Sequence, residues 1–424
     1  MKQTKLADLF KVWGKIGLIS FGGPAGQIAL MHHVIVEEKK WLSEKEYMNA
    51  LSFCMLLPGP EAMQLATYSG WRLRGVAGGL ISGLLFVLPG AAIVLMLAII
   101  YAFYGSTPMM SALFTGIKAA VLVIVLEALS KVAKKNLKTK ASWITAALSF
   151  FALFFLNLPF PMIILCAAFS GFLNHSDAKL QKQRSELYVP VSKTLQTAAI
   201  WLTIWFLPLG LIIGLGGELV FSQLWMFFSK LAAVTFGGAY SVLSYMAQDA
   251  VNTNGWLTAA EMMDALGLAE ATPGPLILVT EFVGFLAAAR VDTGFNLWMG
   301  VGGAFVTLWV TFVPCFLWVF VGAPYIDWIS SKPRLNKALS SVSAAVVGVI
   351  LNLSVWFSFH VLFGQVDQLY FGVFTLWVPD LTSIDLLVLG LVILAAIALI
   401  QLKSGVPLAL TFCAALGFAF SLLN

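Results

Sequence analysis

The sequence predicts an all-helical polytopic membrane protein with two homologous halves in an inverted-topology repeat. Composition, an internal repeat and an unmatched apolar segment between the repeated parts predict this class. Of the 424 residues, 60% are hydrophobic and 11% are charged, whereas a soluble domain carries about 25% charged residues. Runs such as residues 78–100 are long enough to cross a hydrocarbon core of about 30 Å. The composition therefore argues against a soluble protein.

The internal repeat has an offset of 215 residues, as from Lys15 to Lys230, without a gap over positions 15–60. The matches include charged, aromatic and proline residues, which chance matching of apolar residues would not produce. They include Phe21-Gly22-Gly23 with Phe236-Gly237-Gly238 and Pro58-Gly59-Pro60 with Pro273-Gly274-Pro275. Further along, the offset becomes 225, where Pro89 matches Pro314. The chain is therefore a duplication.

Each half supplies six apolar segments, and an extra one, Leu195–Leu215, connects them, giving about 12–13 membrane segments. The segments lie near residues 12–32, 47–70, 76–104, 110–130, 142–157, 159–173, 224–246, 261–289, 295–322, 338–363, 384–402 and 405–423. Six crossings return the chain to its starting side and the seventh takes it across, so the second half starts on the opposite face. We expect a first repeat (1–175), a linker with the connecting helix (176–220) and an inverted second repeat (221–424).

The basic residues predict the orientation. With the N-terminus in the cytoplasm, the outer loops hold only Lys39, Lys40, Lys45 and Arg290, and most other basic residues fall in inner loops. The N-terminal stretch has no small-residue cleavage site, so the first helix is predicted to remain. The net charge of +5 does not indicate nucleic-acid binding, because placement of the basic residues matters more than their sum.

The two Pro-Gly-Pro motifs, Pro58–Pro60 and Pro273–Pro275, interrupt apolar segments at matching positions. Proline removes a backbone donor and clashes with the preceding turn, which is costly where no water can replace the lost bond. Residues after Pro60 and Pro275 are predicted to begin half-helices, whose free N–H groups attract an anion. Glycines at positions 22, 23, 237 and 238 would allow a ligand or another backbone to approach closely. The alternative is that the motifs are packing kinks.

Charged residues inside the segments are further candidates. Lys15 and Lys230 lie at matching positions, six residues before each Phe-Gly-Gly motif, and would supply positive charge to an anion. The alternative for these lysines is snorkelling to the membrane surface. Four buried carboxyls could couple transport to protons, and nothing in the sequence singles one out: Glu61, Glu127, Glu270 and Glu281.

The sequence shows no pattern of a cofactor, metal or catalytic site. The four cysteines lie inside apolar segments without paired spacing. His33 and Glu37 are one turn apart, but the second copy has neither residue there, so a solvated loop is the favoured interpretation. No phosphate-binding loop, zinc-protease helix or nucleophile elbow is present. We predict no cofactor, no metal and no enzyme.

The stretch from Ser20 to Gly75, "SFGGPAGQIALMHHVIVEEKKWLSEKEYMNALSFCMLLPGPEAMQLATYSGWRLRG", resembles the first half of chromate ion transporters. The stretch that begins "TFGGAYSVLSYMAQDAVNTNGWL" resembles their second half. The resemblance covers nearly the whole chain and includes Trp41-Leu42, Gln64 and Gly70. It implies export of chromate across the bacterial inner membrane, chromate resistance, and sulfate as a competing analogue. Pro24 becomes Ala239 in the second copy, so the half-sites are unequal.

Two other functions stay open. A transporter of sulfate or another anion shares every physical argument, because sulfate matches chromate in shape and charge. A membrane-embedded enzyme or scaffold would need a catalytic constellation or breaks that line no cavity. Partners beyond the anion and the lipid bilayer are not indicated. A homodimer stays open, since small residues at Gly75–Gly83 could pack helices within or between subunits.

Overall fold

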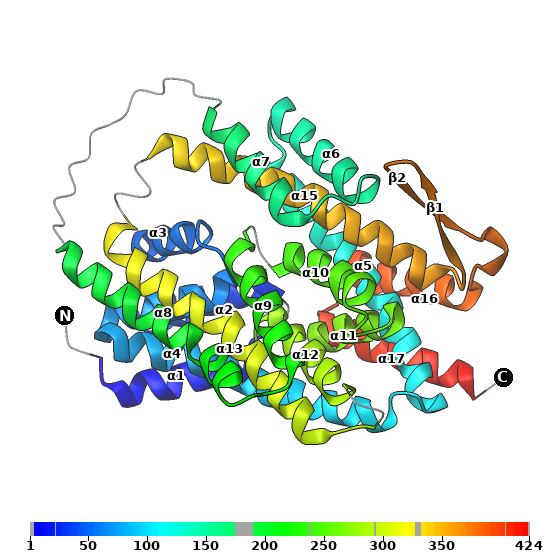
Figure 1. Cartoon of the computed structure of the whole chain (residues 1–424), viewed down its shortest axis with the longest axis horizontal. Coiled ribbons are helices and arrows are strands. Elements are labelled where there is room, and N and C mark those ends of the chain that lie inside the picture. Colours follow the sequence, from blue (N-terminus) through cyan, green and yellow to red (C-terminus); the bar gives the residue numbers. More distant parts are fainter. Residues whose placement is uncertain are drawn as a thin grey trace. The chain divides into compact units, whose positions relative to one another are not determined.

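A computed structural model describes residues 4–21, 23–173, 190–236, 239–291, 294–326, 332–402 and 404–422. Figure 1 shows these residues as a succession of helices with one β-hairpin. Five helical stretches are long and apolar enough to span a membrane, and shorter apolar helices accompany them. The prediction of an all-helical polytopic membrane protein in two repeated halves is therefore confirmed.

The helices of the first half precede the connecting helix α8 (Val191–Gly214). They are α1 (Leu6–Ile19), α2 (Gly23–His32), the π-helix η1 (His33–Glu38), α3 (Glu44–Cys54), α4 (Glu61–Tyr104), α5 (Pro108–Asn136), α6 (Lys140–Phe154) and α7 (Phe160–Leu173). Helix α4 contains a non-helical kink at Arg74 and Gly75. The predicted segments near 12–32 and 47–70 are thus each divided between two helices, with interruptions at Ser20–Phe21 and at the first Pro-Gly-Pro motif.

The second half follows α8 and repeats this order. Its elements are α9 (Leu219–Val234), α10 (Ala239–Gln248), the π-helix η2 (Asp249–Thr253), α11 (Ala259–Ala271), η3 (Leu276–Leu278), α12 (Val279–Ala289), α13 (Leu297–Gly322), η4 (Ala323–Tyr325), α15 (Pro333–Leu362), β1 (Val366–Phe371), β2 (Phe374–Pro379), η5 (Leu381–Ser383), α16 (Leu386–Ala396), η6 (Ile397–Gln401) and α17 (Val406–Ser421). The β-hairpin lies in the stretch between the predicted segments 338–363 and 384–402. Its strands pair in antiparallel register, and Gly372 supplies the positive φ of the tight turn.

The repeat extends to the backbone and its caps. The π-helices η1 and η2 lie at the same offset, and each is followed by a left-handed residue, Lys40 (φ 51°) or Gly255 (φ 60°). Ser43 and Glu46 form a capping box at the start of α3. Thr258 and Glu261 exchange the same bonds at the start of α11. The repeated Glu and the preceding hydroxyl residue are therefore explained by helix capping.

Helices α2 and α3 form a hairpin, so the start of α2 and the end of α3 lie on the same side of it. The Tyr47 hydroxyl donates to the Ile28 carbonyl at 2.7 Å, and the rings of Tyr47 and His32 are 5.2 Å apart. Ten residues of helix span about 15 Å, half of a hydrocarbon core. Helix α2 begins at Gly23, the last residue of the first Phe-Gly-Gly motif, and α3 ends at Cys54, before the first Pro-Gly-Pro motif. A charged tip at one membrane surface therefore puts both interruptions near mid-membrane depth.

The chain forms two compact units that each take segments from both halves, so the units differ from the sequence repeats. Unit 1 comprises Met1–Ala98, His175–Ala239 and Thr272–Asn336, and unit 2 comprises Ile99–Asn174, Tyr240–Ala271 and Lys337–Asn424. In unit 1, α13 packs against α8, α9 and α12. In unit 2, α5 packs against α11, α16 and α17. Small residues at these crossings, such as Gly303 against Gly284, let the backbones approach closely.

Candidate functional site

The two Pro-Gly-Pro motifs, called the first break (Pro58–Pro60) and the second break (Pro273–Pro275), lie in unit 1 and are bound to opposite halves. The Gly59 N–H donates to the Thr235 carbonyl at 2.8 Å, and the Gly274 N–H donates to the Ser20 carbonyl at 2.9 Å. Ser20 and Thr235 are themselves repeat equivalents, each directly before a Phe-Gly-Gly motif. Each break is therefore held by the interrupted helix of the other half.

The packing of the two break glycines is reciprocal as well. A Cβ added to Gly274 would lie 3.3 Å from the Cα of Gly90, and one added to Gly59 would lie 3.0 Å from the Sγ of Cys315. Gly90 and Cys315 are equivalent at the offset of 225, and each follows a helix-interior proline. Gly59 and Gly274 have φ values of 113° and 95°, which L-amino acids rarely adopt. Glycine is thus required at both positions by conformation and by space.

The helix starts after the two breaks differ. Helix α4 begins at Glu61, directly after Pro60, as predicted. After the second break, the 3₁₀ turn Leu276–Leu278 precedes α12, and its residues are fully buried and apolar. Glu61 is half-buried and opposes the positive end of the α4 dipole. The second break is fully buried, whereas Pro58 of the first is only half-buried. The two breaks therefore differ in their helix starts and in their burial.

Two buried glutamines add polar groups to the breaks, and only the first half has them. The Gln27 side-chain amide donates to the Gly274 carbonyl at 2.5 Å and to the Ser20 carbonyl at 3.4 Å. The Gln64 amide donates to the Pro58 carbonyl at 2.6 Å. Their repeat equivalents are Val242 and Val279. Within the described part of the chain, the Oε1 atoms of Gln27 and Gln64 are buried without a hydrogen-bond partner.

The remaining predicted anion-site residues fall in different places. Lys15 on α1 and Lys230 on α9 are exposed on the surface of unit 1. Gly23 begins α2 with a φ of 68°. Gly22, Gly237 and Gly238 lie outside the described residues. The structure thus places Gln64 at the first break, and it leaves the two lysines on exposed helix faces.

The predicted proton-coupling carboxyls have separate environments. Glu281 is buried in unit 1, and its Oε2 has no hydrogen-bond partner among the described residues. In unit 2, Glu127 pairs with Lys131 at 2.5 Å, and Glu270 accepts a hydrogen bond from the Tyr240 hydroxyl at 2.9 Å. None of these contacts joins two of the predicted carboxyls.

The tip of the α2–α3 hairpin carries a network of histidines and glutamates. His33 Nδ1 lies 2.7 Å from Glu37 Oε2, and His32 Nε2 lies 2.6 Å from Glu44 Oε2. The side-chain hydrogen bond to Glu37 raises the pKa of His33, and the same bond lowers the pKa of Glu37. Over the described ranges, no group of three or more such residues is arranged to hold a metal ion.

The His33–Glu37 pair predicts a pH-dependent stability. The raised pKa of His33 means that its contribution is fully present below the ordinary value of 6.5 and is lost as the pH rises through the folded-state pKa. At the acid end it is lost as the pH falls through the lowered pKa of Glu37. We expect His33→Gln to lower the unfolding temperature at about pH 6 and to have no effect at about pH 9. Equal effects at both pH values in a thermal unfolding assay would contradict this.

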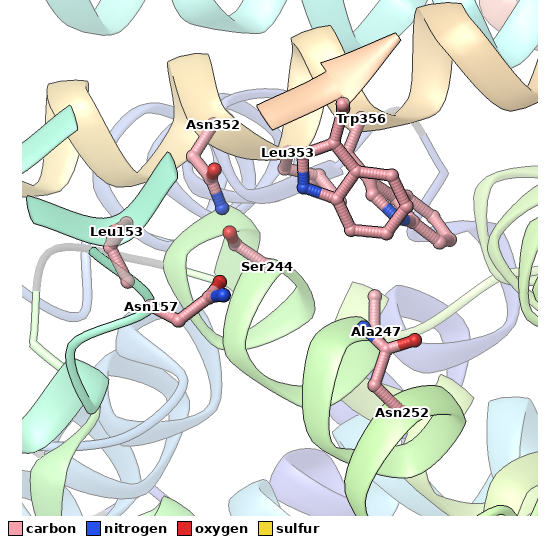
Figure 2. Close-up of a pocket in the computed structure, with 9 residues that line it drawn as sticks. Leu153, Asn157, Ser244, Ala247, Asn252, Asn352, Leu353 and Trp356 are labelled. Carbon is pink, nitrogen blue, oxygen red and sulfur yellow. The ribbon is translucent and has the colours of Figure 1, made fainter. Parts of the chain in front are cut away.

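A small polar pocket lies in unit 2 (Figure 2). The polar ends of Asn157, Ser244 and Asn352 turn toward one another there, and Trp356 covers one side. The cavity of about 20 Å³ accommodates about one water molecule. The Asn157 amide also donates to Thr375 Oγ1 at 2.7 Å, which ties the β-hairpin to the end of α6. The pocket is too small for a tetrahedral oxyanion, and the contacts of its residues indicate a structural role.

Sequence reasoning missed several residues of these arrangements. Ser20 and Thr235 act through backbone carbonyls, for which side-chain identity gives no signal. Gln27 could have been found as a polar residue within an apolar stretch. Asp264 could have been found in the same way, because it lies inside the predicted segment 261–289. It pairs with Lys118 in unit 2.

The chain has two repeated halves, and each helix interruption is hydrogen-bonded to the opposite half. These features define a polytopic membrane protein of the broken-helix, inverted-repeat class found among secondary transporters. The chromate transporter family matches residues 7–172 and again 222–418, and the chain belongs to this family. Over 81% of its length the chain is 30% identical to the chromate transport protein of Pseudomonas aeruginosa, covering 79% of that protein. It is 29% identical to a probable chromate transport protein of Synechococcus elongatus, covering 81% of this chain and 82% of the relative. No solved structure matches the chain.

Proposed function

We propose that the protein is a secondary transporter that exports chromate from the bacterial cytoplasm across the inner membrane and thereby confers chromate resistance. The proposal rests mainly on the two hydrogen bonds that join each break to the opposite half, from the Gly59 N–H to the Thr235 carbonyl and from the Gly274 N–H to the Ser20 carbonyl. Matched helix interruptions at mid-membrane depth are where inverted-repeat transporters build their substrate sites. The chromate transport proteins among the relatives give the substrate.

The anion site in this proposal is formed at the first and second breaks. The Gly59 and Gly274 amides are already bonded to Thr235 and Ser20. The donors for an oxyanion are therefore the N–H groups of the following helical turns, which have no intrahelical acceptor. Gln64 lies at the same place, and Lys15 and Lys230 supply positive charge from exposed positions on α1 and α9.

Export of a dianion needs no ATP. An inside-negative potential is worth about 2.3 kcal/mol per charge per 100 mV, so a leaving dianion gains about 4.6 kcal/mol. This corresponds to a gradient of more than about a thousandfold. Export could then run on the potential alone or with proton exchange through the buried carboxyls Glu61, Glu127, Glu270 and Glu281.

Chromate flux in everted membrane vesicles tests the proposal. We expect chromate uptake when a potential or a pH gradient is imposed, and none in vesicles that lack the protein. Uptake that follows the potential alone would indicate uniport, and a requirement for the pH gradient would indicate proton coupling. No uptake under either condition, with intact protein in the membrane, would refute the proposal.

Sulfate is the alternative substrate, since it has the same shape and charge as chromate. Competition separates the two functions. For a chromate exporter we expect sulfate to slow chromate uptake only in large excess. Uptake of labelled sulfate that chromate barely inhibits would instead identify a sulfate transporter.

A further inference from the structure

An ion pair inside unit 2 is not explained by the repeat or by the breaks. Lys118 Nζ on α5 lies 3.0 Å from Asp264 Oδ1 on α11. The Tyr101 hydroxyl, near the end of α4, donates to Asp264 Oδ2 at 2.8 Å. The Asp264 side chain is 9% exposed and that of Lys118 is 20% exposed. A charged pair at such a position within apolar segments is a functional candidate by default.

The duplicated architecture does not require this pair. The repeat equivalent of Asp264 is Asn49, at the offset of 215, and that of Lys118 is Ser343, at the offset of 225. Both equivalents are uncharged, so the other copy of these repeat positions carries no ion pair. A buried pair is weak evidence for stability, because the desolvation of two charges offsets their attraction. Neither the duplication nor a gain in stability therefore accounts for the pair, which joins α5 of the first half to α11 of the second.

The two oxygens of Asp264 differ in their hydrogen bonding. Oδ2 accepts the Tyr101 hydroxyl. Oδ1 is buried beside the Lys118 ammonium, and no other described group donates a hydrogen bond to it. Oδ1 is therefore the oxygen that can take up a proton when the ion pair opens, while the cation and the hydroxyl stabilise the ionised form. A group that gains and loses a proton during a cycle needs both properties.

The other buried carboxyls lack this combination. Glu281 Oε2 is buried without a hydrogen-bond partner among the described residues, so its ionised form is costly. Glu270 accepts a hydrogen bond from the Tyr240 hydroxyl, and no salt bridge to it is found among the described residues of unit 2. Glu127 pairs with Lys131, whose side chain is 67% exposed, so solvent reaches this ion pair. Of these four carboxyls, Asp264 alone has both a half-buried cation and a hydroxyl hydrogen-bond donor beside it.

We propose that Asp264 is a proton-binding site of the transport cycle, with Lys118 and Tyr101 as its positioning residues. The inference rests on the proposed transport function. A proton from water binds Oδ1 of the carboxylate, the Lys118 ammonium keeps its own protons, and the ion pair between α5 and α11 is lost. Release of the proton restores the pair.

Asp264 lies on α11, which ends at Ala271, two residues before the second break in the sequence. The titratable groups on the elements of unit 2 around it are Lys118, Glu127, Lys131, Lys134 and Lys135 on α5, Tyr101 and Tyr104 at the end of α4, Glu261 and Glu270 on α11, and Cys413 on α17. Of these, Lys118 and Tyr101 contact the Asp264 carboxylate directly.

Asp264→Asn in reconstituted proteoliposomes tests the inference. For the wild type we expect chromate transport to move protons, measured with a trapped pH-sensitive dye, and to respond to an imposed pH gradient. In the variant we expect loss of both responses, while exchange of chromate at equal pH on both sides continues. Asp264→Glu is expected to restore proton movement. Asp367→Asn, the same change at an exposed carboxylate on β1, is the matched control and is expected to behave as wild type.

A second variant guards against loss of folding. Lys118→Met with Asp264→Asn removes both charges, so neither is left buried alone. It is expected to fold, to exchange chromate at equal pH and to move no protons. Proton movement that persists in either variant would overturn the inference, as would a wild type that transports chromate without protons. A wild type that fails to exchange chromate or sulfate at equal pH would instead refute the proposed transport function itself.

Discussion

Replacing Gly90 with alanine is expected to abolish transport, although alanine is the better helix former by about 1 kcal/mol. Gly90 lies inside α4, where an added Cβ would meet the Pro273 carbonyl oxygen at 2.3 Å and the Leu278 Cδ1 at 2.7 Å. The first contact is with backbone, so rotating a side chain cannot relieve it. The second break must therefore move away from α4.

The expected cost has two parts. Overpacking of a close contact costs about 1–3 kcal/mol. Displacement of the second break also strains the bond from the Gly274 N–H to the Ser20 carbonyl. We expect Gly90→Ala protein to insert in the membrane, to unfold at a lower temperature and to show no chromate flux. Insertion is measured by protein level in washed membranes, and flux in everted vesicles.

The matched control for Gly90 is Gly210→Ala in α8. Gly210 is also a helix-interior glycine, and an added Cβ there would meet nothing within 4 Å. This variant gains the same helix propensity without a clash, so we expect normal flux and unchanged or higher stability. If Gly90→Ala transports chromate as well as Gly210→Ala does, close contact between α4 and the second break is not needed for function.

The Gly90 contact also shows what a sequence repeat can and cannot predict. The offset of 215 between Lys40 and Gly255, or between the capping residues Ser43 and Thr258, correctly predicts equal local structure, because local structure depends on nearby residues. It does not predict which repeated segments touch. That Gly274 packs on Gly90, and Gly59 on Cys315, depends on how the halves fold together.

The two breaks were predictable from the sequence, whereas the Asp264–Lys118 ion pair was not. Proline and glycine at the breaks have strong local signals, so both helix interruptions could be located in advance. Asp264 and Lys118 are separated by 146 positions, from 118 to 264, and no local pattern joins them. The interleaved units were unpredictable for the same reason, because a compact unit is defined by contacts between distant segments.

Replacing Gln27 with glutamate is expected to disrupt the second break in a pH-dependent way. The Gln27 amide donates to the carbonyls of Gly274 and Ser20, and the side chain is 1% exposed. An ionised glutamate has only acceptors and would face two carbonyl oxygens, whereas a protonated glutamate can still donate one hydrogen bond. A buried polar group left without its partner costs about 1–3 kcal/mol, and more when charged.

The sign of the pH effect follows from these states. Because the folded structure favours the protonated form of Glu at position 27, the variant loses stability as the pH rises above the ordinary pKa of glutamate, about 4.3. We expect Gln27→Glu to have a lower unfolding temperature than wild type at about pH 8 and to approach wild type at about pH 5. Gln27→Leu, which cannot titrate, is expected to be destabilised equally at both pH values.

Two control variants test whether the lower stability of Gln27→Glu comes from damage to the second break. Gln223→Glu makes the same chemical change at an exposed position of α9 in unit 1, and we expect it to change neither stability nor flux. Gln64→Leu removes the bond to the Pro58 carbonyl at the first break and should lower chromate flux as Gln27→Leu does. If Gln27→Glu is as stable as wild type at about pH 8, the two carbonyls do not need the amide donor. The polar asymmetry between the halves would then have no role in holding the second break.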